Sequence, residues 1–157
     1  VIGFTSCTQA KTVKKKKKVK QSATEIISVK MHRTACFGSC PDYTIEINKD
    51  GNVVFTGFRF TDDTGVFKKN IGVAKSKEII AQFVAYRADT CQELYENRIP
   101  DLPGLNFEIK YPAKTKKIFC ANFGPGFLKE LADAMDAAGK KDDSKGWKKT
   151  GPAPKRR

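Results

Sequence analysis

One segment between residues 42 and 60 constrains the fold of this chain more than any other. Apolar side chains alternate with polar ones along residues 42–48, and the apolar-rich residues 52–60 (NVVFTGFRF) can return as the partner strand. Such alternation places every second side chain on one face of a β-strand. The Lys-Asp-Gly sequence ending at Gly51 is typical of a tight turn, because glycine accepts a positive φ. We therefore expect an antiparallel hairpin with one buried face.

The rest of the central region continues in short elements of two kinds. Apolar residues spaced three and four positions apart predict amphipathic helices at residues 76–87 and 125–138. Alternation predicts further strands at residues 25–32, 66–71, 105–111 and 116–123. The order is therefore strand, hairpin, strand, helix, hairpin, helix. These patterns predict an α+β domain over residues 25–139, in which an antiparallel sheet built from hairpins carries both helices on one face.

The chain has 157 residues and a formal net charge of +13, and this charge is unevenly distributed. Basic and acidic residues are equal in number over residues 21–139, so the excess lies in residues 11–20 and 140–157. Blocks of like charge repel one another and bury little apolar surface, so we expect residues 140–157 to form a disordered or partner-docking tail. A nucleic-acid-binding domain more often carries its excess charge on the folded surface. Nucleic acid is therefore not the expected partner, and a polyanion or nucleic-acid binder acting through the basic tails is an alternative.

The first residues, VIGFTSC, resemble the end of a bacterial lipoprotein signal peptide, in which small residues precede a cysteine that receives the lipid. The resemblance makes Cys7 the expected lipidation site and residues 1–24 the end of a signal, the lipidated cysteine and a polybasic tether. A single acyl chain anchors weakly, whereas a lipid beside a basic run holds firmly. An ordinary N-terminus that contains a cysteine is the alternative. The basic run consists of Lys14, Lys15, Lys16, Lys17 and Lys18.

The most distinctive motif is a loop with two cysteines four residues apart, CFGSCPDY, which leads into the strand at residues 42–48. This motif and the DGNVVFTG hairpin after it resemble an uncharacterised bacterial domain family. Its signature is a CFG-x-CP-x-Y loop entering a strand and a DG-x-V hairpin, and it is found largely in predicted lipoproteins and exported proteins. The resemblance covers roughly residues 25–137. It implies an α+β fold and export, and it implies no activity.

Export would place the cysteines in an oxidising compartment, where disulfides form. The chain has five cysteines, and lipidation of Cys7 would leave four, which allow three pairings. We favour Cys36 with Cys40 and, more weakly, Cys91 with Cys120. Cys120 alternates with apolar neighbours, so a free buried thiol is its alternative.

Zinc is the main alternative for the cysteine loop. The single histidine of the chain, His32, stands four residues before Cys36, and Cys40 follows four residues later, with Asp42 close by. Three nitrogen and sulfur ligands with a carboxylate could form a tetrahedral site, but structural zinc motifs usually supply a second close pair of ligands. A redox pair is a weaker alternative, because dithiol catalysts favour a two-residue spacing. We therefore expect no metal and no cofactor.

Enzyme chemistry finds little support in the sequence. One histidine leaves little room for a Ser/His/Asp or Cys/His mechanism, and no glycine-rich phosphate-binding pattern follows a strand. The only tryptophan, Trp147, lies among Lys, Gly and Pro in the C-terminal region, where it suggests a segment that docks on a partner or at a membrane interface. Chance placement in a disordered tail is the alternative.

These observations together predict a non-catalytic protein that is lipid-anchored to the bacterial outer membrane. We expect it to have a binding or structural role, as an accessory subunit of an outer-membrane complex with a protein partner in the cell envelope. Acidic residues are absent from the expected tether, which favours a domain facing the periplasm over a surface-exposed one. The alternatives are the polyanion binder and a small zinc or redox module at Cys36 and Cys40. No small-molecule substrate is indicated.

Overall fold

The computed structural model describes residues 25–96, 99, 101–142 and 145–155. Within these residues the chain forms an antiparallel sheet of seven strands in the order β6-β5-β1-β2-β3-β4-β7, together with two α-helices and two short 3-10 helices. The strands are β1 (Ser28–Arg33), β2 (Asp42–Asn48), β3 (Asn52–Arg59), β4 (Gly65–Asn70), β5 (Leu105–Lys110), β6 (Thr115–Ile118) and β7 (Lys148–Gly151). The helices are α1 (Val73–Ala85), η1 (Ala88–Thr90), η2 (Ala121–Phe123) and α2 (Phe127–Gly139).

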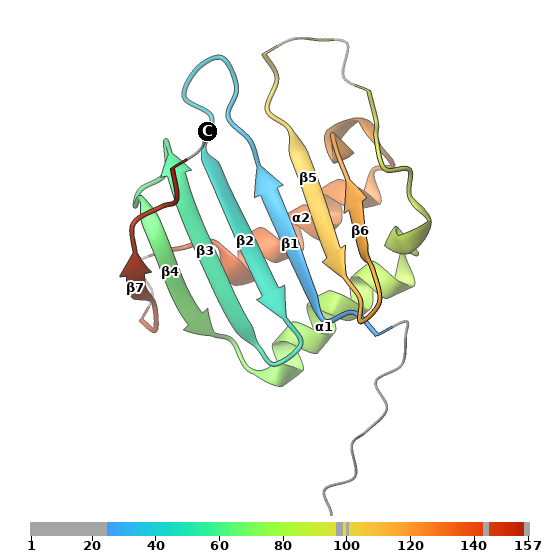
Figure 1. The fold of residues 1–157 in the computed structure, drawn as a ribbon, viewed down its shortest axis with the longest axis horizontal. Helices are drawn as coiled ribbons and strands as arrows, with labels where there is room; N and C mark the ends of the chain where they lie inside the picture. Colours follow the sequence, from blue (N-terminus) through green and yellow to red (C-terminus); the bar gives the residue numbers. More distant parts are fainter. Residues whose placement is uncertain (1–24, 97–98, 100, 143–144, 156–157) are drawn as a thin grey trace, which may run out of the picture.

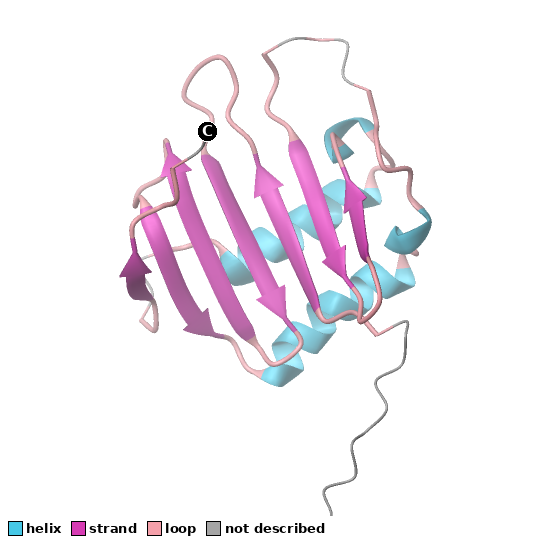
Figure 2. Ribbon diagram, viewed as in Figure 1, coloured by secondary structure: helices cyan, strands magenta, loops and turns pink. Residues whose placement is uncertain are grey.

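Both α-helices cover the same face of the sheet, and none of the described residues forms a helix on the opposite face (Figures 1 and 2). Alternate strand residues face the helices, because successive side chains of a strand point to opposite sides. Val29, Ile45 and Phe107 belong to this set and are almost completely buried. On the helix side, Phe83 of α1 and Leu131 of α2 complete the core. The predicted α+β fold, with an antiparallel sheet and two helices on one face, is confirmed.

The hairpin that dominates the sequence pattern forms as expected between β2 and β3, with Ile45 opposite Phe55. Gly51 in its turn has a φ of 86°, and its Cα lies so close to Gly72 that an added Cβ would come within 2.6 Å of the Gly72 carbonyl carbon. The amide of Ile71 donates a hydrogen bond to the Gly51 carbonyl at 2.8 Å. The hairpin turn and the start of α1 are therefore locked together.

The prediction of a disordered C-terminal tail is wrong for residues 148–151, and the alternative of a partner-docking tail stays a prediction. Residues 148–151 form β7, which extends the sheet beyond β4. Trp147 packs against the core, with its ring centroid 6.2 Å from that of Phe55 in an edge-on arrangement. The lysines of β7 did not suggest a strand in the sequence, because pairing with β4 is a tertiary contact that no local pattern encodes.

Among the described residues, no helix combines the length and the apolar character that a bilayer crossing requires.

Candidate functional site

The open face of the sheet carries a groove of about 320 Å³ with both polar and apolar walls. Its floor consists of alternate residues of β1, β2, β3 and β5, which point away from the helices. The C-terminal segment beyond β7 forms one wall. The residues that line the groove are Lys30, His32, Thr44, Phe58, Asn106, Glu108, Phe119, Pro154 and Lys155.

A carboxylate lies buried at the end of this groove. The Asp42 side chain is only 1% exposed, and its Oδ1 lies 3.1 Å from Nε2 of His32. Its other oxygen, Oδ2, lies 3.9 Å from Nε of Arg59. A β-bulge between Asp42 and Tyr43 places Asp42 opposite Arg59. The imidazole of His32 and the guanidinium of Arg59 therefore face the two oxygens of this buried carboxyl group, as buried polar groups require partners.

The C-terminal segment contributes to this burial. A second hollow, of about 430 Å³, lies beside the first and is lined by residues of β2 and β3 together with Ala153 and Pro154. The sequence indicated Asp42 only as a neighbour of a zinc site, because some residues that share its hollow lie more than 100 positions further along the chain. The pairing of Asp42 with Arg59 depends likewise on strand register, which no short motif encodes.

The cysteine loop lies at the end of the sheet opposite the start of β1 (Figure 1). Cys36 and Cys40 form a disulfide across it, with their Cα atoms 5.4 Å apart. Their sulfurs are therefore bonded to each other, and His32 lies against Asp42. Among the described residues, no group of three or more His, Cys, Asp or Glu side chains could hold a metal ion. The zinc arrangement considered for His32, Cys36 and Cys40 is thus not formed.

The expected bond between Cys91 and Cys120 is not formed either, and both residues are free thiols. An isolated parallel bridge joins Leu94 to Phe119. In a parallel bridge the residue after Phe119 lies beside the residue after Leu94, so Cys120 is aligned with Tyr95 and not with Cys91.

The tip of the cysteine loop presents an apolar side chain to solvent. Phe37 is 88% exposed, and its amide donates a hydrogen bond to the carbonyl of Asp101 at 3.2 Å. Phe60, 54% exposed, lies in the β3–β4 connection at the same end of the sheet. Aromatic residues are enriched at protein–protein interfaces, so Phe37 and Phe60 are candidates for such a contact.

A second polar cluster joins the sheet to α2. The Asp136 carboxylate accepts a hydrogen bond from Nε of Arg33 at 2.8 Å and another from the Tyr43 hydroxyl at 2.7 Å. Burial and the hydrogen bond to Asp136 raise the pKa of Tyr43 well above its usual range. Burial alone would lower the pKa of Arg33, but the negative charges of Asp136 and Asp133 outweigh it and raise that pKa. All three side chains are engaged with one another, so the cluster holds α2 on the sheet.

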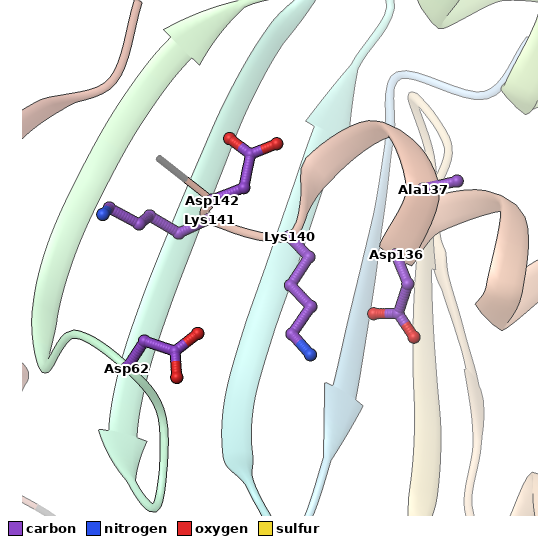
Figure 3. Close-up of a pocket in the computed structure, with 6 residues that line it drawn as sticks. All are labelled: Asp62, Asp136, Ala137, Lys140, Lys141 and Asp142. Atoms are coloured by element: carbon purple, nitrogen blue, oxygen red, sulfur yellow. The ribbon is translucent and has the colours of Figure 1, made fainter. Parts of the chain in front are cut away.

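An open pocket of about 420 Å³ adjoins this cluster at the end of α2 (Figure 3). Figure 3 shows the amine of Lys140 pointing between the carboxylates of Asp62 and Asp136. Lys141 forms an ion pair with Asp63. Carboxylates and lysines both line the pocket, so their charges largely cancel. The pocket therefore shows no preference for an anionic or a cationic ligand. The pocket is lined by Asp62, Asp136, Ala137, Lys140, Lys141 and Asp142.

The remaining predicted site residues divide into two groups. Trp147, expected to dock on a partner, contacts its own domain, with the amine of Lys69 4.5 Å above its ring. Cys7 and the basic run at residues 14–18 lie outside the described residues, so their roles stay predictions.

Comparison with known proteins gives a family and no activity. The model of a family described as a domain of unknown function, DUF6438, matches residues 27–139. This range begins at the entry to β1 and ends with α2, so it contains both helices and every strand except β7. A search of curated proteins found no match. Because the matched range covers most of the chain, the protein belongs to the DUF6438 family.

Proposed function

We propose that this protein is a non-catalytic, lipid-anchored component of the bacterial cell envelope that binds a protein partner. Cys7 carries the lipid, and the residues after it tether the domain to the outer membrane, with the domain facing the periplasm. The domain serves as an accessory subunit of an outer-membrane complex. Support comes from the sequence resemblance at Cys7, from the CFG-x-CP-x-Y loop and from one feature of the fold.

That feature is the opposite placement of the tether entry and the exposed loop. The chain enters the sheet at Ser28, and β1 then runs the whole length of the sheet before the cysteine loop begins (Figure 1). Six residues of strand span about 20 Å. An anchor on the N-terminal side therefore attaches at one end of the domain, and the loop between β1 and β2, which contains Phe37, lies at the other end. This geometry leaves Phe37 and Phe60 free to meet a partner while the lipid is in the membrane.

The disulfide suits this role because it restricts the loop that presents Phe37. A short covalent ring reduces the number of conformations that the loop loses when it binds. Large aromatic side chains supply much of the energy of many protein interfaces. The combination favours Phe37 as the anchor residue of the contact.

Mass and partitioning test the lipid anchor. We expect the protein from its native membranes to carry a lipid on Cys7 in intact mass spectra and to enter the detergent phase. Cys7→Ser should move it to the aqueous phase, whereas Cys91→Ser, which removes a free thiol, should not. A native protein with unmodified Cys7 in the aqueous phase would rule the anchor out.

Cross-linking in native membranes tests the partner surface. We expect a specific cross-linked species with the wild-type chain that is lost with Phe37→Ser. Val84→Ser is the matched control, because Val84 is 54% exposed on α1 and lies outside the loop end. If both variants lose the cross-linked species to the same extent, or if neither loses it, the contact does not belong to the cysteine loop.

Polyanion binding is a second candidate, favoured by four lysines on the paired strands β4 and β7. Lys68 is opposite Lys148, and Lys69 and Lys149 flank this pair. Lysines also protect sheet edges from aggregation, so their presence has a structural explanation as well. Binding to a DNA oligonucleotide that falls steeply with salt, and that is lost with Lys148→Gln/Lys149→Gln, would favour this candidate over the first.

A further inference from the structure

The outer edge of β4 is covered by a segment that lies outside the family match. The match ends at residue 139, the last residue of α2, and eight further residues separate α2 from β7. We propose that the β4 edge and the adjoining groove at Phe58 form a peptide-binding site, which residues 147–155 of this chain occupy. The partner that it fits is an extended segment of another protein, with an aromatic residue followed by lysines and a Gly-Pro turn.

The backbone of the segment binds as an added strand. Lys148 and Lys149 are opposite Lys68 and Phe67 in antiparallel register. A bulge follows, and there the Thr150 hydroxyl donates a hydrogen bond to the Val66 carbonyl at 3.2 Å. Strand addition at a free sheet edge is a general mode of peptide recognition, in which the backbone gives affinity and side-chain pockets give selectivity.

Trp147 provides the first side-chain contact. Its ring packs edge-on against Phe55 at 6.2 Å, and the Lys69 amine lies 4.5 Å over its face. The contact thus combines an aromatic pair with a cation–π interaction. On the same side of the sheet, the Lys149 amine lies 5.5 Å from the Phe67 ring centroid. The site therefore recognises an aromatic residue two positions before a lysine.

The second contact lies on the opposite face of the sheet. After β7 the chain turns back from the β4 edge toward β2 and β3 (Figure 1). Pro154 lines the hollows beside Phe58 and Asp42, and Lys155 lines the groove that contains Glu108. The segment therefore contacts both faces of the sheet, with Trp147 on the helix side and Pro154 on the open side.

The segment can leave without dismantling the domain. In the sheet β7 pairs with β4 alone, so its removal leaves the six-stranded order from β6 to β4 intact. Gly146, just before Trp147, has a φ of 108°, and nothing lies within 4 Å of the position that a Cβ would take, so the residue is not packed into the domain. A tethered segment has an effective concentration of about 1 mM at its own site. A free peptide of similar affinity therefore displaces it only at a comparable concentration. The site is thus self-occupied at rest, and this holds whether or not Cys7 carries a lipid.

A cleavable full-length chain tests the proposal. A protease recognition sequence is inserted between Lys145 and Gly146, and a fluorescent peptide of residues 146–157 is added after cleavage and washing. We expect the peptide to bind the cleaved chain at least about 100-fold more tightly than the uncut chain, because the tether no longer competes. A Trp147→Ala peptide should bind at least tenfold more weakly, and a scrambled peptide of the same charge should not bind measurably.

Three outcomes would overturn the proposal. Equal peptide binding to cut and uncut chains would place the peptide elsewhere, and equal binding of the scrambled peptide would reduce the interaction to charge. An uncut dimer that the peptide converts to monomers would show that the tail of a second copy fills the site.

Hydrogen exchange of the uncut chain covers the case in which cleavage unfolds the protein. A displaceable tail requires the amides of β7 to exchange at least tenfold faster than those paired between β2 and β3. Exchange of both sets at one common rate would show that the tail leaves only on global unfolding, and it would contradict the proposal.

Discussion

At the residue scale, Gly139 determines how closely α2 approaches the sheet. An added Cβ there would lie 2.5 Å from Cγ2 of Ile45 and 3.1 Å from Cγ1 of Val53. Alanine gains about 1 kcal/mol of helix propensity over glycine, but overpacking a rigid core costs about 1–3 kcal/mol. We expect Gly139→Ala to lower the free energy of unfolding by about 1 kcal/mol in urea titration. Gly126→Ala, where nothing lies within 4 Å, is the control, and an equal or higher stability of Gly139→Ala would contradict this.

Asp136 is the residue that joins β1, β2 and α2. Its half-buried carboxylate accepts hydrogen bonds from both Arg33 and Tyr43. Asp133 bonds the same guanidinium at 3.1 Å from a far more exposed position. We expect Asp136→Asn to lower the free energy of unfolding by about 2 kcal/mol, because it removes the negative charge that pairs with the partly buried Arg33 and accepts the Tyr43 hydrogen bond, and Asp133→Asn to lower it by less than about 0.5 kcal/mol. Similar losses in denaturation midpoints for the two variants would show that the network does not depend on Asp136.

The raised pKa of Tyr43 makes stability depend on alkaline pH. The unfolded chain loses the phenolic proton near pH 10, whereas burial and the Asp136 hydrogen bond keep it on the folded chain. Above pH 10 the folded state therefore binds more protons, so the free energy of unfolding falls as pH rises. Tyr43→Phe should show a shallower fall than the wild type between pH 9.5 and about 11 in urea titrations. Parallel curves would mean that Tyr43 ionises alike in both states.

At the element scale, the cysteine loop and the two free thiols allow a direct count. Under denaturing, non-reducing conditions we expect a Cys7→Ser variant to show two reactive thiols, those of Cys91 and Cys120. Four would exclude the disulfide, and none would show that Cys91 and Cys120 pair.

Closing a ring of five residues restricts the unfolded chain by about 2 kcal/mol in the chain-entropy model. Cys36→Ser/Cys40→Ser should therefore lose about that much stability, and Cys91→Ser/Cys120→Ser should lose less.

Elements with strong local signals were predictable, and those that depend on distant contacts were not. The β2–β3 hairpin was readable because alternation and the turn at Gly51 lie within one short stretch. β7 was not, because its four residues include two lysines and its pairing partner lies about 80 positions earlier. The Cys36–Cys40 bond required only close spacing, whereas the error over Cys91 and Cys120 came from strand alignment. The burial of Asp42 likewise needed register and the C-terminal segment.

At the scale of the whole molecule, the folded body carries more positive charge than the sequence suggested. Residues 21–139 are neutral, but part of the basic C-terminal region belongs to the fold, because β7 completes the sheet. Its lysines therefore stand at fixed positions beside those of β4. Basic residues are therefore concentrated at this sheet edge and, in the sequence, at residues 14–18.

The two regions should differ in their contribution to membrane binding. Basic residues near an anionic membrane contribute about 1 kcal/mol each, and salt screens this attraction. For the lipid-free Cys7→Ser chain, we expect replacement of Lys14–Lys18 by Gln to weaken sedimentation with phosphatidylserine vesicles at least tenfold in 0.1 M salt. Lys148→Gln/Lys149→Gln should weaken vesicle binding less. Strand pairing holds these two lysines at one sheet edge, where few other basic side chains can contact the membrane at the same time. A larger loss with the second variant would make the sheet edge the membrane-facing surface, and it would contradict an orientation in which the membrane lies at the end where β1 begins.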